Sequence, residues 1–336
     1  MIHPIPSGTR DVLPDEMGEL RAIERNMRAV FERSGYGEIS TPALEYESTL
    51  ARADVGEARP TYRLFDEQGN VLVLRPDMTV PIARVAATRY GAVEPPLRFF
   101  YVAHAYRGVR PQRGQPREFL QAGIELIGAP SPEGTVEALR LLCAALDAAG
   151  VRDYRVGLGD ASLYPALLED CHVPAEGRER VMEELVTRDF AGLEREVRAL
   201  ELPAAAAELL ISTPQRRGGP EVFEDAAGPD TDALASLRRV YGMLEPGVAD
   251  RVLVDLGLVR SLGYYTGAVF EVYDPSLGQP LGGGGRYDDL LGRFGRPLPA
   301  VGFALNVERL HIVLANQEQP SDSDAPADGG PTRSEQ

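Results

Sequence analysis

Two side chains that can bind a polar ligand, Gln121 and Glu125, lie four residues apart in one β-prone segment, Arg117–Ile127. Side chains two or four residues apart on a strand point to the same face. Strand parity is therefore consistent with this amide and this carboxylate projecting into one cavity. There the carboxylate can accept hydrogen bonds from N–H groups, and the amide can donate as well as accept.

The other residue types that could carry chemistry mainly exclude classes of site. Only two cysteines occur, Cys143 and Cys171, and no CxxC or cysteine–histidine cluster exists that would hold zinc. No metal and no other cofactor is predicted. The glycine run Gly282–Gly285 lacks the GxGxxG spacing of a dinucleotide site. It is interpreted either as a close approach of the backbone to a ligand or as a turn.

A basic, glycine- and proline-rich loop over residues 107–116 raises the alternative of a nucleic-acid-binding module. Such a module would use the arginines of this region, Arg107, Arg110, Arg113 and Arg117. The formal net charge of −16 argues against a large nucleic-acid surface, although it does not exclude a local basic patch. Nucleic acid is therefore not expected as a partner.

The segments that must position these residues predict an α+β fold. Helical spacing of apolar residues predicts helices at 15–34, 79–88, 135–149 and about 306–316. β-prone runs predict strands at 37–41, 62–65, 71–74, 97–106, 117–127, 252–256, 267–273 and 301–305. The strands group into antiparallel-looking hairpins while the helices group elsewhere. We therefore predict an antiparallel sheet flanked by helices.

Composition divides the chain further. Residues from about 160 to 247 are rich in alanine, leucine, glutamate and arginine, which predicts a helical insertion within a core of residues 1–316. Residues 317–336 are polar and are expected to be disordered. The N-terminus lacks the features of a signal peptide, and no apolar stretch is long enough to span a membrane. A cytoplasmic location is therefore expected.

Four blocks, met in the same order, resemble the histidyl-tRNA synthetases, a family of class II aminoacyl-tRNA synthetases. They are LRPDMT at 74–79, Arg107 with REFLQAGIE at 117–125, LVRSLGYYTGAVFE at 258–271, and LGGGGRYD at 281–288. The resemblance covers roughly residues 5–312. It implies a class II synthetase-like catalytic core with a pocket for histidine.

Within that family, the chain is more similar to a shorter, non-aminoacylating paralogue, the regulatory subunit of ATP phosphoribosyltransferase. Residues 77–79 and 121–128 carry this likeness, and only the polar tail follows Leu314 where the synthetases continue into an anticodon-binding domain. The resemblance implies a short catalytic phosphoribosyltransferase as partner, which performs the first committed step of histidine synthesis. It also implies feedback by histidine and, by analogy, a homodimeric unit formed through about residues 14–45.

The resemblance assigns pocket residues to each polar group of histidine. The predicted set is Asp77, Thr79, Arg107, Gln121, Glu125, Arg260, Tyr264, Tyr265 and Tyr287. The Arg260 guanidinium matches a carboxylate bidentately. Asp77, Thr79 and Gln121 would hold the ammonium group. Asp77 and Thr79 are also good caps for the predicted helix 79–88, and the two roles can coexist.

The imidazole ring is assigned to Glu125 and Tyr265. A carboxylate accepts the ring N–H, and a phenol can donate to or accept from the other nitrogen. Tyr287 would close the wall of the pocket. For these tyrosines, ordinary packing in the core is the competing interpretation.

The nucleotide half of the site departs from the synthetase pattern. Arg107 and Arg309, which would contact the α-phosphate and the nucleotide, are present. Four other expected residues are replaced: glutamate by Val109, arginine by Gln115, aspartate by Gly263 and glycine by Asn306. We therefore predict a non-catalytic subunit that senses histidine. The alternative is a histidine-activating ligase that lacks its anticodon domain.

Overall fold

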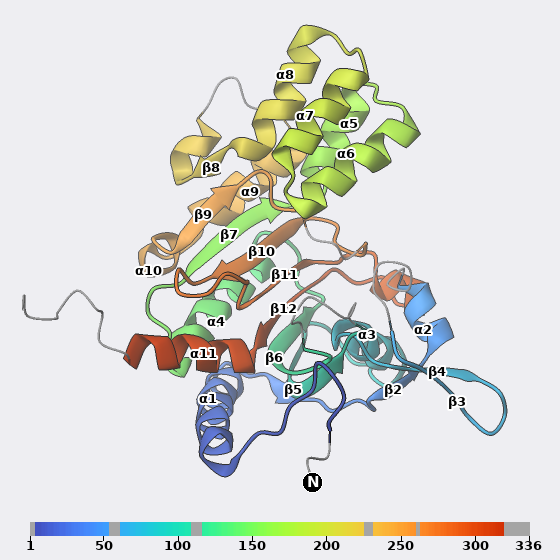
Figure 1. Cartoon of the computed structure of the whole chain (residues 1–336), viewed down its shortest axis with the longest axis vertical. Helices are drawn as coiled ribbons and strands as arrows, with labels where there is room; N and C mark the ends of the chain where they lie inside the picture. The colour runs from blue at the N-terminus through green and yellow to red at the C-terminus, as the bar shows by residue number, and fades with distance from the viewer. Residues whose placement is uncertain (1–3, 54–60, 109–115, 225–230, 260–262, 319–336) are drawn as a thin grey trace, which may run out of the picture.

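A nine-stranded sheet forms the centre of the protein (Figure 1). The computed structural model describes residues 4–53, 61–108, 116–224, 231–259 and 263–318. The strand order across the sheet is β1-β5-β6-β12-β11-β10-β7-β9-β8. Its strands are β1 (Gly37–Glu38), β5 (Leu97–Tyr106), β6 (Glu118–Ile127), β7 (Arg155–Asp160), β8 (Arg217–Gly218), β9 (Val252–Asp255), β10 (Ala268–Tyr273), β11 (Gly282–Arg286) and β12 (Ala300–Asn306).

Neighbouring strands of this sheet are antiparallel except in the pairs β1–β5 and β7–β9. The longest pair, β5–β6, runs from Leu97 opposite Ile127 to Tyr106 opposite Glu118. These bounds agree with the strands predicted at 97–106 and 117–127. The predicted α+β class, with an antiparallel sheet flanked by helices, is confirmed.

The glycine run forms strand β11, in the interior of the sheet between β12 and β10. The sequence had suggested a turn or a ligand contact, because glycine has low strand propensity. A Cβ on Gly284 would lie 2.7 Å from the Phe303 Cα and would overlap the Gly302 carbonyl oxygen. The close approach permitted by glycine is thus to the neighbouring strand β12, within the sheet itself.

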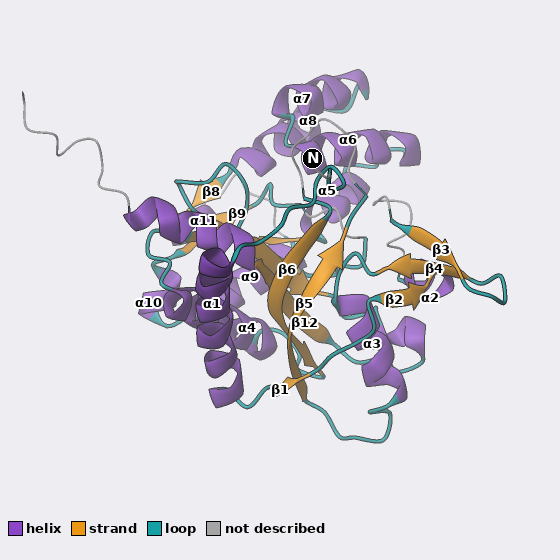
Figure 2. Ribbon diagram, turned by 60° about the horizontal axis from the view of Figure 1, so that its bottom comes forward, coloured by secondary structure: helices purple, strands orange, loops and turns teal. Residues whose placement is uncertain are grey.

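Helices cover one face of the sheet, termed here the helix-covered face (Figure 2). Three of them contact β6: α1 (Pro14–Arg33), α4 (Glu133–Ala149) and α11 (Val307–Glu318). Leu120, Ile124 and Leu126 of β6 are buried in the core that these helices form. The even-numbered residues of β6 therefore point to this face.

The odd-numbered residues of β6 point to the opposite face, termed here the site face. Ile127 joins a second buried cluster there, with residues of β5 and of α3 (Thr79–Thr88). A small sheet of order β2-β4-β3 lies beside α3. This small sheet and its helix comprise β2 (Leu44–Tyr46), α2 (Glu47–Arg52), β3 (Arg63–Phe65) and β4 (Val71–Leu74). The predicted helix 79–88 and the hairpin on either side of residues 66–70 are confirmed.

Helices dominate the chain between β7 and β9, and the first four of them, α5 to α8, lie at the top of Figure 1. They are α5 (Leu163–Asp170), α6 (Ala175–Thr187), α7 (Phe190–Ala199), α8 (Ala204–Ser212), α9 (Asp232–Gly242) and α10 (Pro246–Ala249). Helix α9 packs on α4, β7 and β10, and β8 extends the main sheet. Part of the region is thus built into the core, and a separate insertion at about 160–247 stays a prediction.

Helix α11 ends at Glu318, two residues inside the segment 317–336 that was expected to be disordered. Leu310 and Val313 are fully buried on this helix, which anchors it to the helix-covered face. Residues 319–336 lie outside the described residues. Within the described ranges, no helix combines the length and the apolar character needed to cross a membrane.

Asn306 ends β12 and caps α11, because its Oδ1 accepts a hydrogen bond from the Arg309 backbone N–H at 2.9 Å. Replacing Asn306 by alanine is expected to lower the free energy of unfolding by about 1 kcal/mol, the usual loss for an N-cap. Asn306→Asp keeps an acceptor and is the control. Urea denaturation checks both variants, and equal midpoints for Asn306→Ala and the unmodified chain would contradict this role.

Candidate functional site

The structure brings Gln121 and Glu125 together on the site face of β6, where both are buried. Gly302 of β12 stands opposite Glu125 in the strand register. A Cβ on Gly302 would overlap the Glu125 carboxylate and would lie 2.6 Å from the Ile124 carbonyl oxygen. Gly302 therefore provides the space in which the Glu125 side chain lies.

Two hydroxyl groups from other elements donate to the Glu125 carboxyl group. Thr79 Oγ1, in the first turn of α3, donates to Oε1 at 2.8 Å, and the Tyr287 hydroxyl donates to Oε2. Burial raises the pKa of Glu125 to about 8, against the lowering effect of these two hydrogen bonds and with a further increase from Asp77. In the free protein at neutral pH, Glu125 is therefore mostly protonated.

Asp77 precedes α3 and uses its two carboxylate oxygens differently. Oδ1 accepts the Val80 backbone N–H at 3.3 Å, so the predicted capping role of Asp77 is present. Oδ2 is buried and has no hydrogen-bond partner among the described residues, and the same holds for Gln121 Oε1. Buried polar atoms are nearly always paired in proteins, with protein groups, water or a ligand, so each of these two oxygens is available to accept a hydrogen bond from a ligand.

The three predicted tyrosines lie together beside these polar groups. Tyr264 and Tyr287 are each only 2% exposed, with ring centroids 5.9 Å apart in a T-shaped arrangement. The Tyr265 ring is tilted by 54° against the Tyr264 ring, with centroids 5.0 Å apart, and Tyr265 is partly exposed. Tyr264 and Tyr287 belong to the buried cluster of the site face, as core packing had suggested. Tyr287 also donates a hydrogen bond to Glu125, so this side chain both packs in the core and contacts the site.

Arg107 and Arg260 are the remaining predicted residues. The Arg107 guanidinium lies 4.7 Å from the centroid of the Phe119 ring. Phe119 is six residues from Glu125 along β6, which is about 20 Å at the usual rise of a strand. Arg107 is thus near the Gln121 end of the site face and far from the Glu125 end. Arg260, the candidate for the carboxylate, lies outside the described residues.

The structure describes some of the residues that the sequence analysis assigned to the nucleotide half of the site. Asn306 caps α11, and the Arg309 guanidinium donates to the Pro280 carbonyl oxygen. Gly263 is exposed. Val109 and Gln115 lie outside the described residues.

Sequence reasoning missed Tyr101 and Gly302. Tyr101 of β5 is 1% exposed, and Asp77, Glu125 and Tyr265 all lie close enough to raise its pKa further once burial has raised it. Tyr101 has the same strand parity as Leu97 and Phe99, so its inward orientation could have been predicted. Its position relative to Glu125 depends on the pairing of β5 with β6, which no local pattern reveals.

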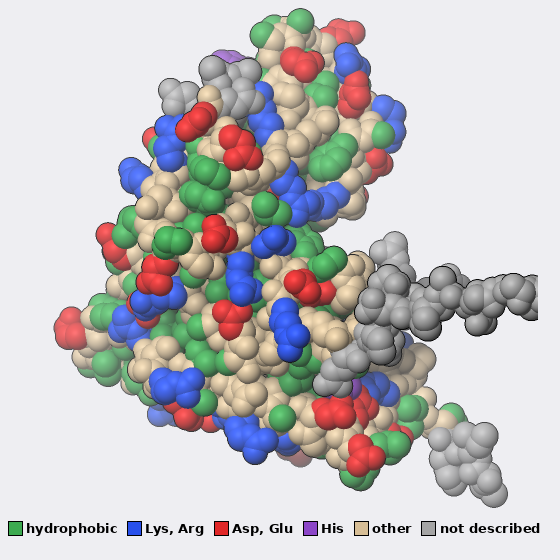
Figure 3. Space-filling model, turned by 90° about the vertical axis from the view of Figure 1, so that its left-hand side faces the viewer, with side chains coloured by type: hydrophobic (Ala, Val, Ile, Leu, Met, Phe, Trp, Pro, Cys, Tyr) green, Lys and Arg blue, Asp and Glu red, His purple; other side chains and the backbone are tan. Residues whose placement is uncertain are grey.

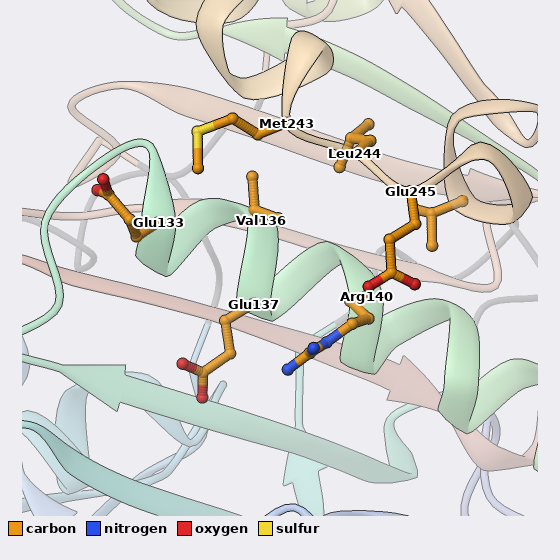
Figure 4. A pocket seen from close by; sticks show the side chains of 8 residues that line it. Glu133, Val136, Glu137, Arg140, Met243, Leu244 and Glu245 are labelled. Carbon is orange, nitrogen blue, oxygen red and sulfur yellow. The ribbon is translucent and has the colours of Figure 1, made fainter.

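Two surface hollows lie elsewhere, and neither is lined by a predicted site residue. One lies between α4 and the turn before α10 (Figure 4) and is lined by Glu133, Val136, Glu137, Arg140, Met243, Leu244, Glu245 and Val248. The other is lined by charges of both signs, with Arg152, Arg155, Arg217 and Arg251 beside Asp153, Asp250 and Asp274. Positive and negative side chains also intermix over the face drawn in Figure 3.

Comparison with known proteins places the chain in a family. The model of the histidyl-tRNA synthetase family matches residues 8–310. The chain is 42% identical to the ATP phosphoribosyltransferase regulatory subunit of Symbiobacterium thermophilum, over 94% of this chain and 80% of that protein. It is 38% identical to that of Desulforamulus reducens, over 93% of this chain and 79% of that protein. The chain belongs to the ATP phosphoribosyltransferase regulatory subunits of the histidyl-tRNA synthetase family.

A solved structure agrees with this membership in the regulatory-subunit family. It is described as an ATP phosphoribosyltransferase regulatory subunit/histidyl-tRNA synthetase from Bacillus halodurans. The match has a TM-score of 0.87 at 36% identity and covers 94% of this chain and 84% of that one. The predicted class II synthetase-like core and the predicted likeness to regulatory subunits are both confirmed.

Proposed function

We propose that this protein is a non-catalytic regulatory subunit of a short-form ATP phosphoribosyltransferase, and that it binds free histidine on the site face. The observation that carries the proposal is that two buried oxygens, Asp77 Oδ2 and Gln121 Oε1, have no hydrogen-bond partner among the described residues. The names of the relatives support the regulatory role. We place the protein in the cytoplasm, where histidine and the substrates of the partner enzyme are available.

Histidine supplies what these groups need. Its ammonium group carries three donors, which suit the unpaired oxygens of Asp77 and Gln121. Its imidazole ring would lie against Glu125 and Tyr265 and would share one proton with the Glu125 carboxyl group. Its carboxylate would pair with Arg260. Each buried group left unpaired costs about 1–3 kcal/mol, so amino acids without the ring would be rejected.

The residues expected to contact ATP support a protein that binds histidine without activating it. A synthetase must hold ATP and stabilise charge on its α-phosphate. In this chain the Asn306 side chain is used as a helix cap, and the Arg309 guanidinium is hydrogen-bonded to the Pro280 carbonyl oxygen. The Arg107 guanidinium lies on the Phe119 ring, which removes that aromatic face from stacking with a base.

Regulation requires that histidine favour one state of an assembly over another, typically by about 1–3 kcal/mol. We propose that histidine shifts the complex with the catalytic subunit towards its inhibited state. A homodimeric unit formed near residues 14–45 is part of this proposal. It is supported by apolar side chains exposed at either end of that segment, where Leu13 is 68% and Leu44 is 44% exposed.

Isothermal titration calorimetry with histidine tests the pocket. Asp77→Asn is expected to weaken histidine binding tenfold or more, because a hydrogen bond to a charged group is worth about 1.5–3 kcal/mol. Asp66→Asn, in the exposed turn between β3 and β4, is the matched control and should bind as the unmodified chain does. Absence of histidine binding to the unmodified chain, alone and with the catalytic subunit, would disprove the proposal.

A second measurement separates this proposal from the alternative of a histidine-activating ligase. In an ATP–pyrophosphate exchange assay, histidine is expected to produce no exchange above background. Robust histidine-dependent exchange would favour the ligase and would exclude the non-catalytic role.

A further inference from the structure

The Arg188 side chain joins the helical part of the chain to the central sheet. Arg188 directly follows α6, one of the helices at the top of Figure 1. Its Nη2 donates to Asp255 Oδ2 at 3.2 Å and to the Tyr273 hydroxyl at 3.4 Å. Because Asp255 ends β9 and Tyr273 ends β10, one guanidinium links the end of α6 to two strands of the sheet.

Asp255 and Tyr273 both point to the site face. The residues that precede them, Val254 and Val272, are buried in the core of the helix-covered face. Successive side chains on a strand point to opposite faces, so Asp255 and Tyr273 point away from that core. The contacts of Arg188 are therefore made on the same face of the sheet as the proposed histidine pocket.

Asp255 is only 2% exposed, so its carboxylate depends on partners within the protein. Oδ1 accepts the Gly257 backbone N–H at 3.1 Å, and the Arg217 Nε lies 3.7 Å from Oδ2. Arg188, at 3.2 Å, makes the shorter of the two ion pairs. Loss of a partner is costly for a buried charge, so without Arg188 the position of Asp255 would no longer be fixed.

The chain segment after Asp255 leads to the proposed pocket. It passes beside the turn that follows α8, where a Cβ on Gly257 would lie 3.1 Å from the Pro214 Cα and would overlap the Pro214 carbonyl oxygen. Further along the same segment come Tyr264 and Tyr265 of the candidate site. Asp255 therefore sets where this segment begins, and the helical part of the chain limits how far it can move.

We propose that Arg188 is a positioning residue for the histidine pocket, acting through Asp255 on the segment that supplies Tyr264 and Tyr265. The inference rests on the proposed function, since it describes how that pocket is held and how its state is passed on. Histidine bound beside these tyrosines restrains the segment, and Asp255 and Arg188 carry the restraint to the end of α6. The coupling is reciprocal, so a partner that holds α6 in place strengthens histidine binding.

The backbone of Arg188 allows its side chain to be tested separately. Its φ of 58° is left-handed, a conformation that has a steric cost for residues with a Cβ and that glycine adopts freely. Glycine therefore suits the end of α6 while it removes the guanidinium. Glu201, between α7 and α8, has the same kind of backbone, with a φ of 51°, but its side chain is exposed and forms no ion pair with a described residue.

Hydrogen–deuterium exchange of the full chain, with and without saturating histidine, tests the coupling. In the unmodified chain, histidine is expected to slow amide exchange about fivefold or more, both at Tyr264 and Tyr265 and in the last turn of α6, a usual size for coupling between sites. In Arg188→Gly the protection at the two tyrosines should remain and the protection of α6 should disappear. Histidine affinity, measured by calorimetry, should fall about fivefold for the same reason.

Glu201→Gly is the matched control, because it changes the same backbone conformation away from the sheet, and it should keep both protections. Arg188→Gln retains a long polar side chain without the charge and should behave as Arg188→Gly does, so the test does not depend on how glycine affects α6. A residue that only stabilises α6 would change its exchange equally with and without histidine. That result overturns the inference, as does α6 protection that persists in both Arg188 variants or is absent from the unmodified chain with histidine bound. If the unmodified chain does not bind histidine, the proposed function fails instead.

Discussion

Histidine affinity is expected to be greatest between about pH 6.5 and pH 8 and to fall about tenfold per pH unit on either side. The lower limit is the ordinary pKa of an imidazole ring. The upper limit is the pKa of Glu125, which burial raises to about 8. In the complex the ring and the carboxyl group share one proton, so binding must release a proton below this window and take one up above it.

Glu125→Gln separates these two limits. Glutamine has no titrating group, and its amide resembles the protonated carboxyl group in shape and in its ability to donate to the ring. The fall below about pH 6.5 should remain, whereas the fall above pH 8 should disappear until the histidine ammonium itself loses its proton. Calorimetry in half-unit steps from pH 5.5 to 9 measures both profiles. A flat profile for the unmodified chain, or the same upper limit in Glu125→Gln, would exclude a shared proton.

The parts of this structure that could be predicted from sequence are those fixed by local periodicity. Strand β5 and helix α3 agree with the predicted ranges at both ends, because apolar spacing and β-branched or aromatic content act within each segment. The common orientation of Gln121 and Glu125 follows from strand alternation alone. Their ligand roles came from the family resemblance, and periodicity does not provide them.

The rest depends on contacts between distant parts of the chain. The position of Tyr101 over Gly123 follows from the register of β5 against β6, and one residue of slippage would move Tyr101 to the other face. The Thr79 hydroxyl donates to Glu125, 46 residues away in sequence. The sequence alone therefore could not decide whether Thr79 caps helix α3 or contacts the site. Strand β11 consists largely of glycine, because side chains at Gly282 and Gly284 would overlap the backbone of the neighbouring strand β12.

Gly302→Ala should have the largest effect on the fold and should also abolish histidine binding. The new Cβ would overlap the Glu125 carboxylate and would lie 2.6 Å from the Ile124 carbonyl oxygen. The carbonyl belongs to the backbone of β6, paired with β12 in the interior of the sheet, so it cannot move without disturbing that pairing. Overpacking of this kind costs about 1–3 kcal/mol and occasionally more, and here we expect about 3 kcal/mol.

Gly18→Ala is the control for this substitution, because a Cβ at that position in α1 meets no atom within 4 Å. Alanine in a helix interior is more favourable than glycine by roughly 0.5–1 kcal/mol, so the control should be slightly more stable than the unmodified chain. Urea denaturation measures the stabilities of both variants. Calorimetry then measures the histidine affinity of Gly302→Ala under conditions in which the denaturation curve shows that it is folded. If Gly302→Ala is destabilised but still binds histidine normally, the glycine serves only the sheet. If Gly302→Ala loses both stability and histidine binding, the space above Gly302 is needed to keep the Glu125 side chain in position to contact histidine.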